Sequence, residues 1–262
     1  MNIDINAKLQ YFKIGKYGGI HAKTDDYSNT PRPYFSIGMI LRGNGKFYTE
    51  NSDVVNVSPG EIIIVPSAAT YISHWHGTPN ISFITFHFIF DKDFEGNIPI
   101  QKISSFEHLK KDFEFAYENF SVPAHAFKVL SIFYNMLSEI FPSIKIISEK
   151  HINSSIKKAV DYITYNYTNN INIAELSKIA NLSPSRFFTV FKKETGVSPI
   201  EYKNRISIRN AEKMLVSEDY SIEEISEKIG FNSASYFRRT FKAFTGKSPR
   251  EYKNAFRENP KL

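Results

Sequence analysis

"SYFRRTFKAFTGKSPREYK", residues 235–253, repeats an earlier stretch of the same chain, "SRFFTVFKKETGVSPIEYK", residues 185–203. The two stretches are identical at 11 of 19 positions, whereas about one identity is expected by chance for residue types of average abundance. The chain therefore contains an internal repeat. Two copies are too few to stack into a solenoid, so each copy has to be interpreted by what it can do as a unit.

Each copy, with the apolar segment before it, has the pattern of a short helix, a tight turn and a second helix. Asn181 occupies the turn of the first copy and Gly230 that of the second, and both residue types tolerate a left-handed backbone. Ser183 and either Asn232 or Ser233 are predicted to cap the helices that follow. The residues predicted to face the core are Ile173, Leu176 and Ala180, then Ile222, Ile225 and Ile229. The pattern predicts two helix-turn-helix units.

The second helix of each unit is predicted to have a buried side and a polar side. The buried side is marked by pairs of phenylalanine, Phe187 with Phe191 and Phe237 with Phe241. At 100° per residue, the opposite side carries Ser185 and Thr189 in one copy and Ser235 and Arg239 in the other. A short helix with such a face can enter the major groove of DNA. One such helix alone is more simply explained as a solvated face, but two copies joined by a long helix favour DNA binding.

The positive charge of the chain is concentrated where the repeat lies. Residues 1–153 contain 14 Lys+Arg and 15 Asp+Glu, a net charge of −1, whereas residues 154–262 contain 19 and 12, a net charge of +7. This asymmetry indicates a polyanionic partner. A solvated basic surface would explain the charge equally well if the charge stood alone.

Two motifs carry a resemblance to the AraC family of transcription regulators. "IANLSPSRFFTVFKKETGVSPIEYK" resembles the first helix-turn-helix of that family and "IGFNSASYFRRTFKAFTGKSPREYK" the second, while "RISIRNAEKML" resembles the helix that bridges them. The resemblance covers roughly residues 154–256 and departs from the family at Ser177 and Ser226, where a small apolar residue is usual. It implies double-stranded DNA and RNA polymerase as partners, a homodimer, and insertion of both second helices into successive major-groove segments.

Carried over by position, the resemblance implies a set of DNA-contacting residues on the two second helices. They are Ser185, Arg186, Phe188, Thr189 and Lys192 in the first copy, and Ala234, Ser235, Arg238, Arg239 and Lys242 in the second. The first of these helices has few strong hydrogen-bonding side chains, but Phe188 can contact a thymine methyl group.

The front of the chain has a different pattern. Short β-branched or aromatic runs separated by Gly, Pro, Asn and Asp predict strands within residues 33–90. A helical period follows over residues 106–120 and 129–141, and Pro142 ends it. We expect an α+β protein with a cupin-like antiparallel β-barrel and two helices over residues 1–142, a linker over 143–153, and an all-α double helix-turn-helix domain over 154–262. The apolar face of the second helix is predicted to form the dimer, with coverage of its own barrel as the alternative.

The strand region resembles the cupin-type sensing barrel that often precedes this DNA-binding domain. Gly60 and Pro66 match its glycine–strand–proline stretch, but Tyr71 stands where metal-dependent cupin enzymes have a ligand histidine. A metal needs several convergent ligands, so we expect neither metal, cofactor nor catalysis. A metal bound by His74, His76 and His87 is the less favoured alternative.

The barrel is instead expected to bind a small-molecule effector. The effector-binding candidates are Arg32, Trp75, Phe83, Thr85 and His87, the last three of which share one strand face by parity. Trp75 can stack on a sugar ring, although packing is the simpler role for it. A sugar or related polar metabolite is the class expected.

The sequence therefore predicts a sequence-specific DNA-binding transcription regulator controlled by an effector. The alternative is a cupin-type metal enzyme with an accessory nucleic-acid-binding domain. A DNA-repair fusion would need a cysteine acceptor, and the chain has no cysteine. The chain has no long apolar run, so no membrane span is expected. It also has no basic start followed by an apolar block, so no signal peptide is expected. The expected location is therefore the cytoplasm. Whether the protein activates or represses is left open.

Overall fold

A computed structural model describes residues 7–29, 31–49, 53–92, 94, 96–147, 153–217 and 219–257 of the chain. The described residues divide into two compact units, on either side of a boundary at residues 148 and 149. We call them the N-terminal unit and the C-terminal unit. Residues 143–147, which the sequence assigned to the linker, belong with the N-terminal unit: Ile144 is buried and Ile147 N donates to Asn97 O at 2.8 Å. The remainder of the predicted linker, up to residue 152, lies outside the described residues.

The N-terminal unit is built on two antiparallel sheets. The five-stranded sheet has the order β1 (Leu9–Gly18), β8 (Ser82–Phe90), β3 (Phe35–Arg42), β6 (Ile62–Val65) and β9 (Gln101–Ile103). The four-stranded sheet has the order β2 (Ala22–Asp26), β7 (Tyr71–His76), β4 (Asn44–Thr49) and β5 (Val54–Val57). The runs predicted as strands within 33–90 are confirmed as β3, β4, β6 and β8, whereas β1, β2, β5 and β9 were not predicted.

The two sheets pack face to face around a cluster of apolar side chains. This cluster joins Ile40, Ile63 and Phe83 of the larger sheet to Phe47 and Trp75 of the smaller one. Alternation along β8 explains the arrangement, because successive side chains of a strand point to opposite faces. The odd-numbered side chains of β8 point between the sheets and the even-numbered ones point to the other face, so one strand supplies two cores.

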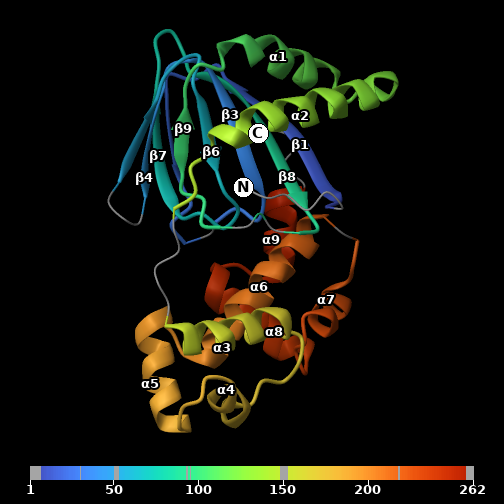
Figure 1. The fold of residues 1–262 in the computed structure, drawn as a ribbon. Coiled ribbons are helices and arrows are strands. Elements are labelled where there is room, and N and C mark those ends of the chain that lie inside the picture. Colours follow the sequence, from blue (N-terminus) through green and yellow to red (C-terminus); the bar gives the residue numbers. More distant parts are fainter. Residues whose placement is uncertain are drawn as a thin grey trace. The chain divides into compact units, whose positions relative to one another are not determined.

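The outer face of the five-stranded sheet is covered by α1 (Lys110–Asn119) and α2 (Ala126–Ile140) (Figure 1). Phe86 and Phe88 of β8 lie in one core with Phe113 of α1 and Phe133 of α2. The residues of α2 that are buried in this core are Val129, Ile132, Phe133, Met136, Leu137 and Ile140. The apolar face from which we predicted a dimer is therefore used to cover the sheet of its own subunit.

The C-terminal unit is helical in all the regular structure that is described. Its helices are α3 (Ser154–Tyr165), α4 (Ile173–Ile179), α5 (Pro184–Thr195), α6 (Pro199–Ser217), α7 (Ile222–Lys228), α8 (Ala234–Thr245) and α9 (Pro249–Arg257). The pairs α4–α5 and α7–α8 are the two helix-turn-helix units, with α6 between them (Figure 1). The mixed α+β fold class that the sequence predicts is confirmed.

The predicted core of each helix-turn-helix unit is confirmed as well. Phe187, Phe191, Phe237 and Phe241 have no exposed surface. The buried members of the first helices are Leu176 and Ala180 in one unit and Ile225 and Ile229 in the other, while Ile173 and Ile222 are half-buried. Within the described residues, we find no helix with the length and apolar character that crossing a membrane requires.

Candidate nucleic-acid interface and inter-sheet pocket

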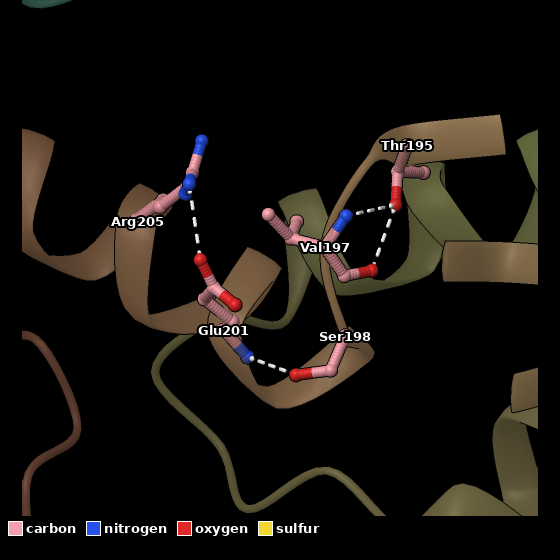
Figure 2. Close-up of polar contacts among 5 residues, drawn as sticks. All are labelled: Thr195, Val197, Ser198, Glu201 and Arg205. Atoms are coloured by element: carbon pink, nitrogen blue, oxygen red, sulfur yellow. Dashed lines mark hydrogen bonds and ion pairs between the residues drawn. The ribbon is translucent and has the colours of Figure 1, made fainter. Parts of the chain in front are cut away.

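The repeated Thr-Gly residues end the second helix of each unit in the same way. Thr195 Oγ1 donates to Val197 O at 3.0 Å and accepts from Val197 N at 3.4 Å (Figure 2). Thr245 Oγ1 makes the same two bonds with Lys247, at 3.0 and 3.3 Å. The glycines that follow have a left-handed backbone, with φ of 79° at Gly196 and 73° at Gly246. Such a C-terminal glycine ends a helix without the steric penalty that a Cβ would bring.

The repeated Ser-Pro-x-Glu residues begin the next helix. Ser198 Oγ accepts from Glu201 N at 3.2 Å, and Glu201 Oε1 accepts from Arg205 Nη2 at 3.0 Å (Figure 2). In the second copy, Ser248 Oγ accepts from Glu251 N at 3.3 Å while Glu251 Oε2 accepts from Ser248 N at 2.7 Å. The second copy thus has a reciprocal capping box. The sequence repeat is therefore a repeated junction between two helices, α5 with α6 and α8 with α9. In each copy the same residues end one helix and begin the next.

The turns before α5 and α8 have the backbone predicted for them. Asn181 has a φ of 53° and Gly230 a φ of 77°. A Cβ atom on Gly230 would lie 1.9 Å from Thr168 O, so the second turn requires glycine for space as well as for backbone conformation. Ser233, rather than Asn232, caps α8 by accepting from Tyr236 N at 3.2 Å.

The first turn and the family departures differ slightly from expectation. Ser183 stands at the N-cap of α5, but its side chain makes no cap bond. Ser177 and Ser226 are both buried, so serine fits these positions. The Ser177 hydroxyl donates to Ala174 O at 2.9 Å, whereas the buried Ser226 hydroxyl has no hydrogen-bond partner among the described residues.

The helix α5 presents its predicted DNA-contacting residues to solvent. All five are exposed: Ser185, Arg186, Phe188, Thr189 and Lys192. Phe188 exposes 43% of its surface although its neighbour Phe187 is completely buried. The Thr189 hydroxyl donates to Ser185 O at 3.1 Å within the helix, which leaves the methyl group of Thr189 as its outermost part. This face therefore offers apolar as well as polar contacts.

The helix α8 presents a more basic face. Ser235, Arg238, Arg239 and Lys242 are exposed, while Ala234 is half-buried. Arg238 forms an ion pair with Glu223 of α7, so its guanidinium is already oriented. The Arg239 guanidinium carbon lies 5.4 Å from the centre of the Tyr236 ring, a distance at which the cation is attracted to the aromatic face.

These two faces have the chemistry of direct base readout. An arginine can make a bidentate contact with guanine O6 and N7. An exposed phenylalanine can contact a thymine methyl group, and lysines further along the helix can meet phosphates, which position the protein without specifying sequence. The C-terminal unit thus brings together on two helices all ten of the residues that the sequence singled out.

The second candidate site is a pocket between the two sheets of the N-terminal unit. Its lining includes four of the residues predicted to bind an effector, Arg32, Trp75, Phe83 and Thr85. Phe83 and Trp75 stack with ring centres 4.3 Å apart, and Trp75 Nε1 donates to Ser73 Oγ at 3.2 Å. Trp75 therefore packs against protein, as the simpler hypothesis held. The room left inside the pocket is only about 30 Å³.

His87 is not among the lining residues of the pocket, and both of its ring nitrogens have a hydrogen-bond partner. Its Nδ1 lies 2.8 Å from Ser36 Oγ and its Nε2 lies 3.0 Å from Thr85 Oγ1. Burial, assisted by the positive charges of Arg32 and Lys13, holds the pKa of His87 well below its ordinary value. His87 is therefore a neutral ring that orients the Ser36 and Thr85 hydroxyls of the pocket wall.

The three histidines weighed as metal ligands do not converge. His74 and His76 are exposed on the outer face of β7, and His74 Nδ1 lies 3.2 Å from Thr24 Oγ1. His87 is buried between the sheets. Within the described residues, the structure has no cluster of three or more His, Asp or Glu side chains with the geometry to hold a metal ion.

Several lining residues of the pocket were missed from the sequence. Tyr17 and Asp25 come from β1 and β2, which the sequence did not predict as strands, and Tyr71 lies in β7. Tyr27 does not line the pocket, but the centre of its ring lies 4.1 Å from the Arg32 guanidinium carbon. The sequence signal for these lining residues was the pair of tyrosines in "YGG…DDY", which lies shortly before Arg32. No periodic pattern marks them.

Comparisons with known proteins concern mainly the C-terminal unit. Residues 176–255 match the family model described as a helix-turn-helix domain. The lactose operon transcription activator of Staphylococcus xylosus is 34% identical over 95 residues, which are 36% of this chain and 34% of that protein. The match therefore spans about a third of that relative. The raffinose operon transcriptional regulatory protein RafR of Pediococcus pentosaceus is 23% identical over 225 residues, 79% of each chain.

The solved structure of ToxT from Vibrio cholerae, with an unsaturated fatty acid bound, is similar over the full length of both chains. The TM-score is 0.56 and the sequence identity 14%, so this likeness concerns the arrangement of sheets and helices. The helix-turn-helix match, the regulators that share it and the paired helix-turn-helix units joined by α6 agree with one another. The chain carries a helix-turn-helix domain similar to that of AraC-type transcription regulators.

Proposed function

We propose that this protein is a sequence-specific DNA-binding transcription regulator whose DNA binding is controlled by a small molecule in the inter-sheet pocket. The observation that carries the proposal is the pair of exposed faces on α5 and α8, each held by the same junction and turn. Two reading helices on one unit suit two successive segments of the major groove. The relatives reported above are named as regulators of sugar operons, which supports a role at promoters.

Electrostatics supports the same partner. Residues 154–262 carry a net charge of +7, whereas residues 1–153 carry −1. Each phosphate contact by a lysine or arginine releases a counterion, so the affinity is expected to fall steeply with salt concentration. The positive charge supplies attraction to any DNA, and the base contacts of α5 and α8 supply the preference for one sequence.

The test is a selection of genomic DNA fragments by the full chain, followed by affinity measurements on the enriched site and on a shuffled copy of it. We expect the enriched site to bind at least ten-fold more tightly, and both affinities to fall steeply between low and physiological salt. Lys158, which is exposed and belongs to α3 rather than to either reading helix, provides a control: Lys158→Ala should keep the preference. Equal affinity for both DNAs, or binding that ignores salt, would contradict the proposal.

The alternative of a metal-dependent enzyme is not supported. The relatives reported above are transcription regulators rather than enzymes, and Tyr71 stands at the position of the cupin ligand histidine. A pocket that holds a ligand without transforming it is what the regulator requires.

A homodimer remains part of the proposal, but on a different surface from the one predicted. The outer side of α2 exposes Phe127, at 89% of its surface, together with Tyr134. If the dimer uses this side, Phe127→Ala should shift the sedimentation of the full chain from dimer to monomer at micromolar concentration, whereas Lys128→Ala should leave it unchanged. A wild-type monomer at that concentration would remove the dimer from the proposal. RNA polymerase is proposed as a further partner on the family resemblance alone.

A further inference from the structure

The inter-sheet pocket contains a buried cation with unused hydrogen-bonding capacity. Arg32 is only 9% exposed. Its Nη2 donates to the Tyr27 hydroxyl and its guanidinium carbon lies 4.1 Å from the Tyr27 ring centre. Its Nε is buried with no hydrogen-bond partner, and no ion pair joins Arg32 to a carboxylate of the described residues. A buried charge without a counter-charge is costly, so this side chain is built for a partner that the chain does not supply.

A second buried donor faces the same space. The hydroxyl oxygen of Tyr17 is buried and has no hydrogen-bond partner among the described residues. Tyr17 and Arg32 both line the pocket. Burial raises the pKa of Tyr17, so its phenol keeps its proton and can donate. Two unpartnered donors in one pocket, one of them on a cation, call for a ligand with acceptor atoms and negative charge.

The charged side chains around the pocket also favour a negatively charged ligand. Asp25 also lines the pocket, but it is paired with Lys23, whose Nζ lies 3.0 Å from Asp25 Oδ1. Lys23 Nζ also lies 4.5 Å from the centre of the Tyr17 ring. With His87 neutral, these side chains comprise two cations, Lys23 and Arg32, and one anion, Asp25. Because Asp25 is paired with Lys23, Arg32 is left as a charged lining residue without an ion pair to a carboxylate of the described residues.

The size and walls of the pocket limit the ligand further. The room of about 30 Å³ corresponds to about two water molecules, which is the size of the two oxygens of a carboxylate. Tyr17 stacks on Phe83 at 4.6 Å and Phe83 on Trp75 at 4.3 Å. This aromatic wall suits an apolar or aromatic body next to the charged group.

From these observations we propose that the effector is a carboxylate, with its two oxygens held by the Arg32 guanidinium and the Tyr17 hydroxyl and its apolar body against the Tyr17–Phe83–Trp75 stack. The inference rests on the proposed function, because it names the effector class of that regulator. It differs from the expectation of a sugar or related polar metabolite, because the hydroxyls of a sugar would leave the buried charge without a counter-ion. Arg–carboxylate pairs with parallel hydrogen bonds are among the strongest such contacts in proteins.

The experiment uses the full chain and Trp75, its only tryptophan, as a fluorescence probe inside the pocket. The probes are acetate, hexanoate, benzoate and cinnamate, each compared with its own uncharged amide, and D-glucose. We expect at least one carboxylate to change the Trp75 emission and to raise the unfolding temperature. Its amide should bind roughly ten-fold more weakly or worse, since a hydrogen bond to a charged group outweighs a neutral one.

Variants assign the binding to the named side chains. Arg32→Met should abolish the preference for the carboxylate over its amide, and Tyr17→Phe should weaken carboxylate binding by about ten-fold. Arg42→Met is the matched control, because Arg42 is exposed and bonded to Asn80 at 3.0 Å, and it should bind as the wild type does. If Arg32→Met does not fold, Arg32→Lys, which keeps the charge, should keep the preference, and Tyr17→Phe still has to show the loss.

The proposal is overturned if an amide binds as tightly as its carboxylate, if D-glucose binds and the carboxylates do not, or if no carboxylate of the panel produces any response. DNA binding by the same preparation is measured in parallel. Sequence-specific DNA binding without a carboxylate response would overturn the effector class and leave the regulator in place, whereas loss of sequence-specific DNA binding would overturn the proposed function itself.

Discussion

At the scale of single residues, the choice of reading face depends most directly on Arg239. This residue is exposed on α8, opposite the buried Phe237 and Phe241. Arg239→Ala should cost about 1–3 kcal/mol of binding free energy on the best site and relax the preference at one base pair. Folding should not change, because the side chain takes no part in the apolar core. Affinities for single-base variants of the operator, measured with wild type and variant, check this.

Lys247 supplies the comparison for Arg239. It lies beyond the end of α8, and it should meet phosphate rather than a base. Lys247→Ala should therefore weaken binding to all the single-base variants alike. If Arg239→Ala also lost affinity evenly and kept the wild-type preference at every position, Arg239 would be a phosphate contact and the reading face would be wrongly assigned.

Gly230 is the residue whose replacement should disturb the C-terminal unit most. Its φ of 77° already disfavours a side chain, and a Cβ would meet Thr168 O at 1.9 Å. Gly246 has a similar φ of 73° but nothing within 4 Å of its would-be Cβ. Gly246→Ala should therefore cost about 1 kcal/mol of unfolding free energy, the price of the backbone conformation alone. Gly230→Ala should cost clearly more, because the Thr168 backbone has to move.

Hydrogen exchange of the amides in the apolar core of the C-terminal unit measures both glycine variants. Equal losses of protection in Gly230→Ala and Gly246→Ala would mean that the turn between α7 and α8 can move away from Thr168. The contact between a Cβ at residue 230 and Thr168 O would then add nothing to the loss of unfolding free energy.

At the scale of elements, the bridging helix α6 contains a buried carboxyl group. Burial raises the pKa of Glu212 to about 7, although a hydrogen bond from Tyr252 and the nearby Arg209 and Lys213 oppose the shift. The folded state therefore keeps this proton up to about pH 7, while the unfolded chain releases it near its ordinary pKa of 4.5. The stability of the C-terminal unit should consequently fall as the pH rises from 4.5 to 7, and should change no further above that range.

Replacement of Glu212 by glutamine isolates this effect. Between pH 5.5 and pH 8 the wild type should lose about 2 kcal/mol relative to Glu212→Gln. The exchange rates of α6 amides, corrected for intrinsic exchange at each pH, give the two free energies. Glu201→Gln, an exposed change on the same helix, should follow the wild type. A pH profile of Glu212→Gln parallel to that of the wild type would show that Glu212 ionises normally in the folded protein.

The elements differ in how much the sequence reveals about them. The helices α5 and α8 could be predicted with their faces, because phenylalanines spaced four apart and a turn residue before each helix fix both period and start. The strands β1 and β2 could not, since "LQYFKIGKYG" and "AKTDD" mix charged residues into an irregular alternation. Their side chains become half-buried only when they pair with β8 and β7. Helix α2 was predicted as an element, but its apolar face could equally have served a dimer or its own sheet.

At the scale of the whole molecule, the sequence indicates which part of the chain binds DNA, but it does not reveal which side chains form the pocket. The repeat and the charge asymmetry mark residues 154–262 as the basic, DNA-binding part. The pocket brings together Tyr17 of β1, Asp25 of β2 and Arg32, which lies between β2 and β3. No local pattern links such residues, because tertiary packing alone makes neighbours of them.

The central claim is that one chain reads two successive major-groove segments with α5 and α8. The most direct measurement is a selection from random DNA with the full-length wild type, Arg239→Ala and Phe188→Ala. The wild type should enrich a site with two conserved segments centred about one helical turn, roughly 10 base pairs, apart. Arg239→Ala should lose information in one segment only, and Phe188→Ala in the other only. A single undivided motif, or an even loss over the whole site in both variants, would contradict the account.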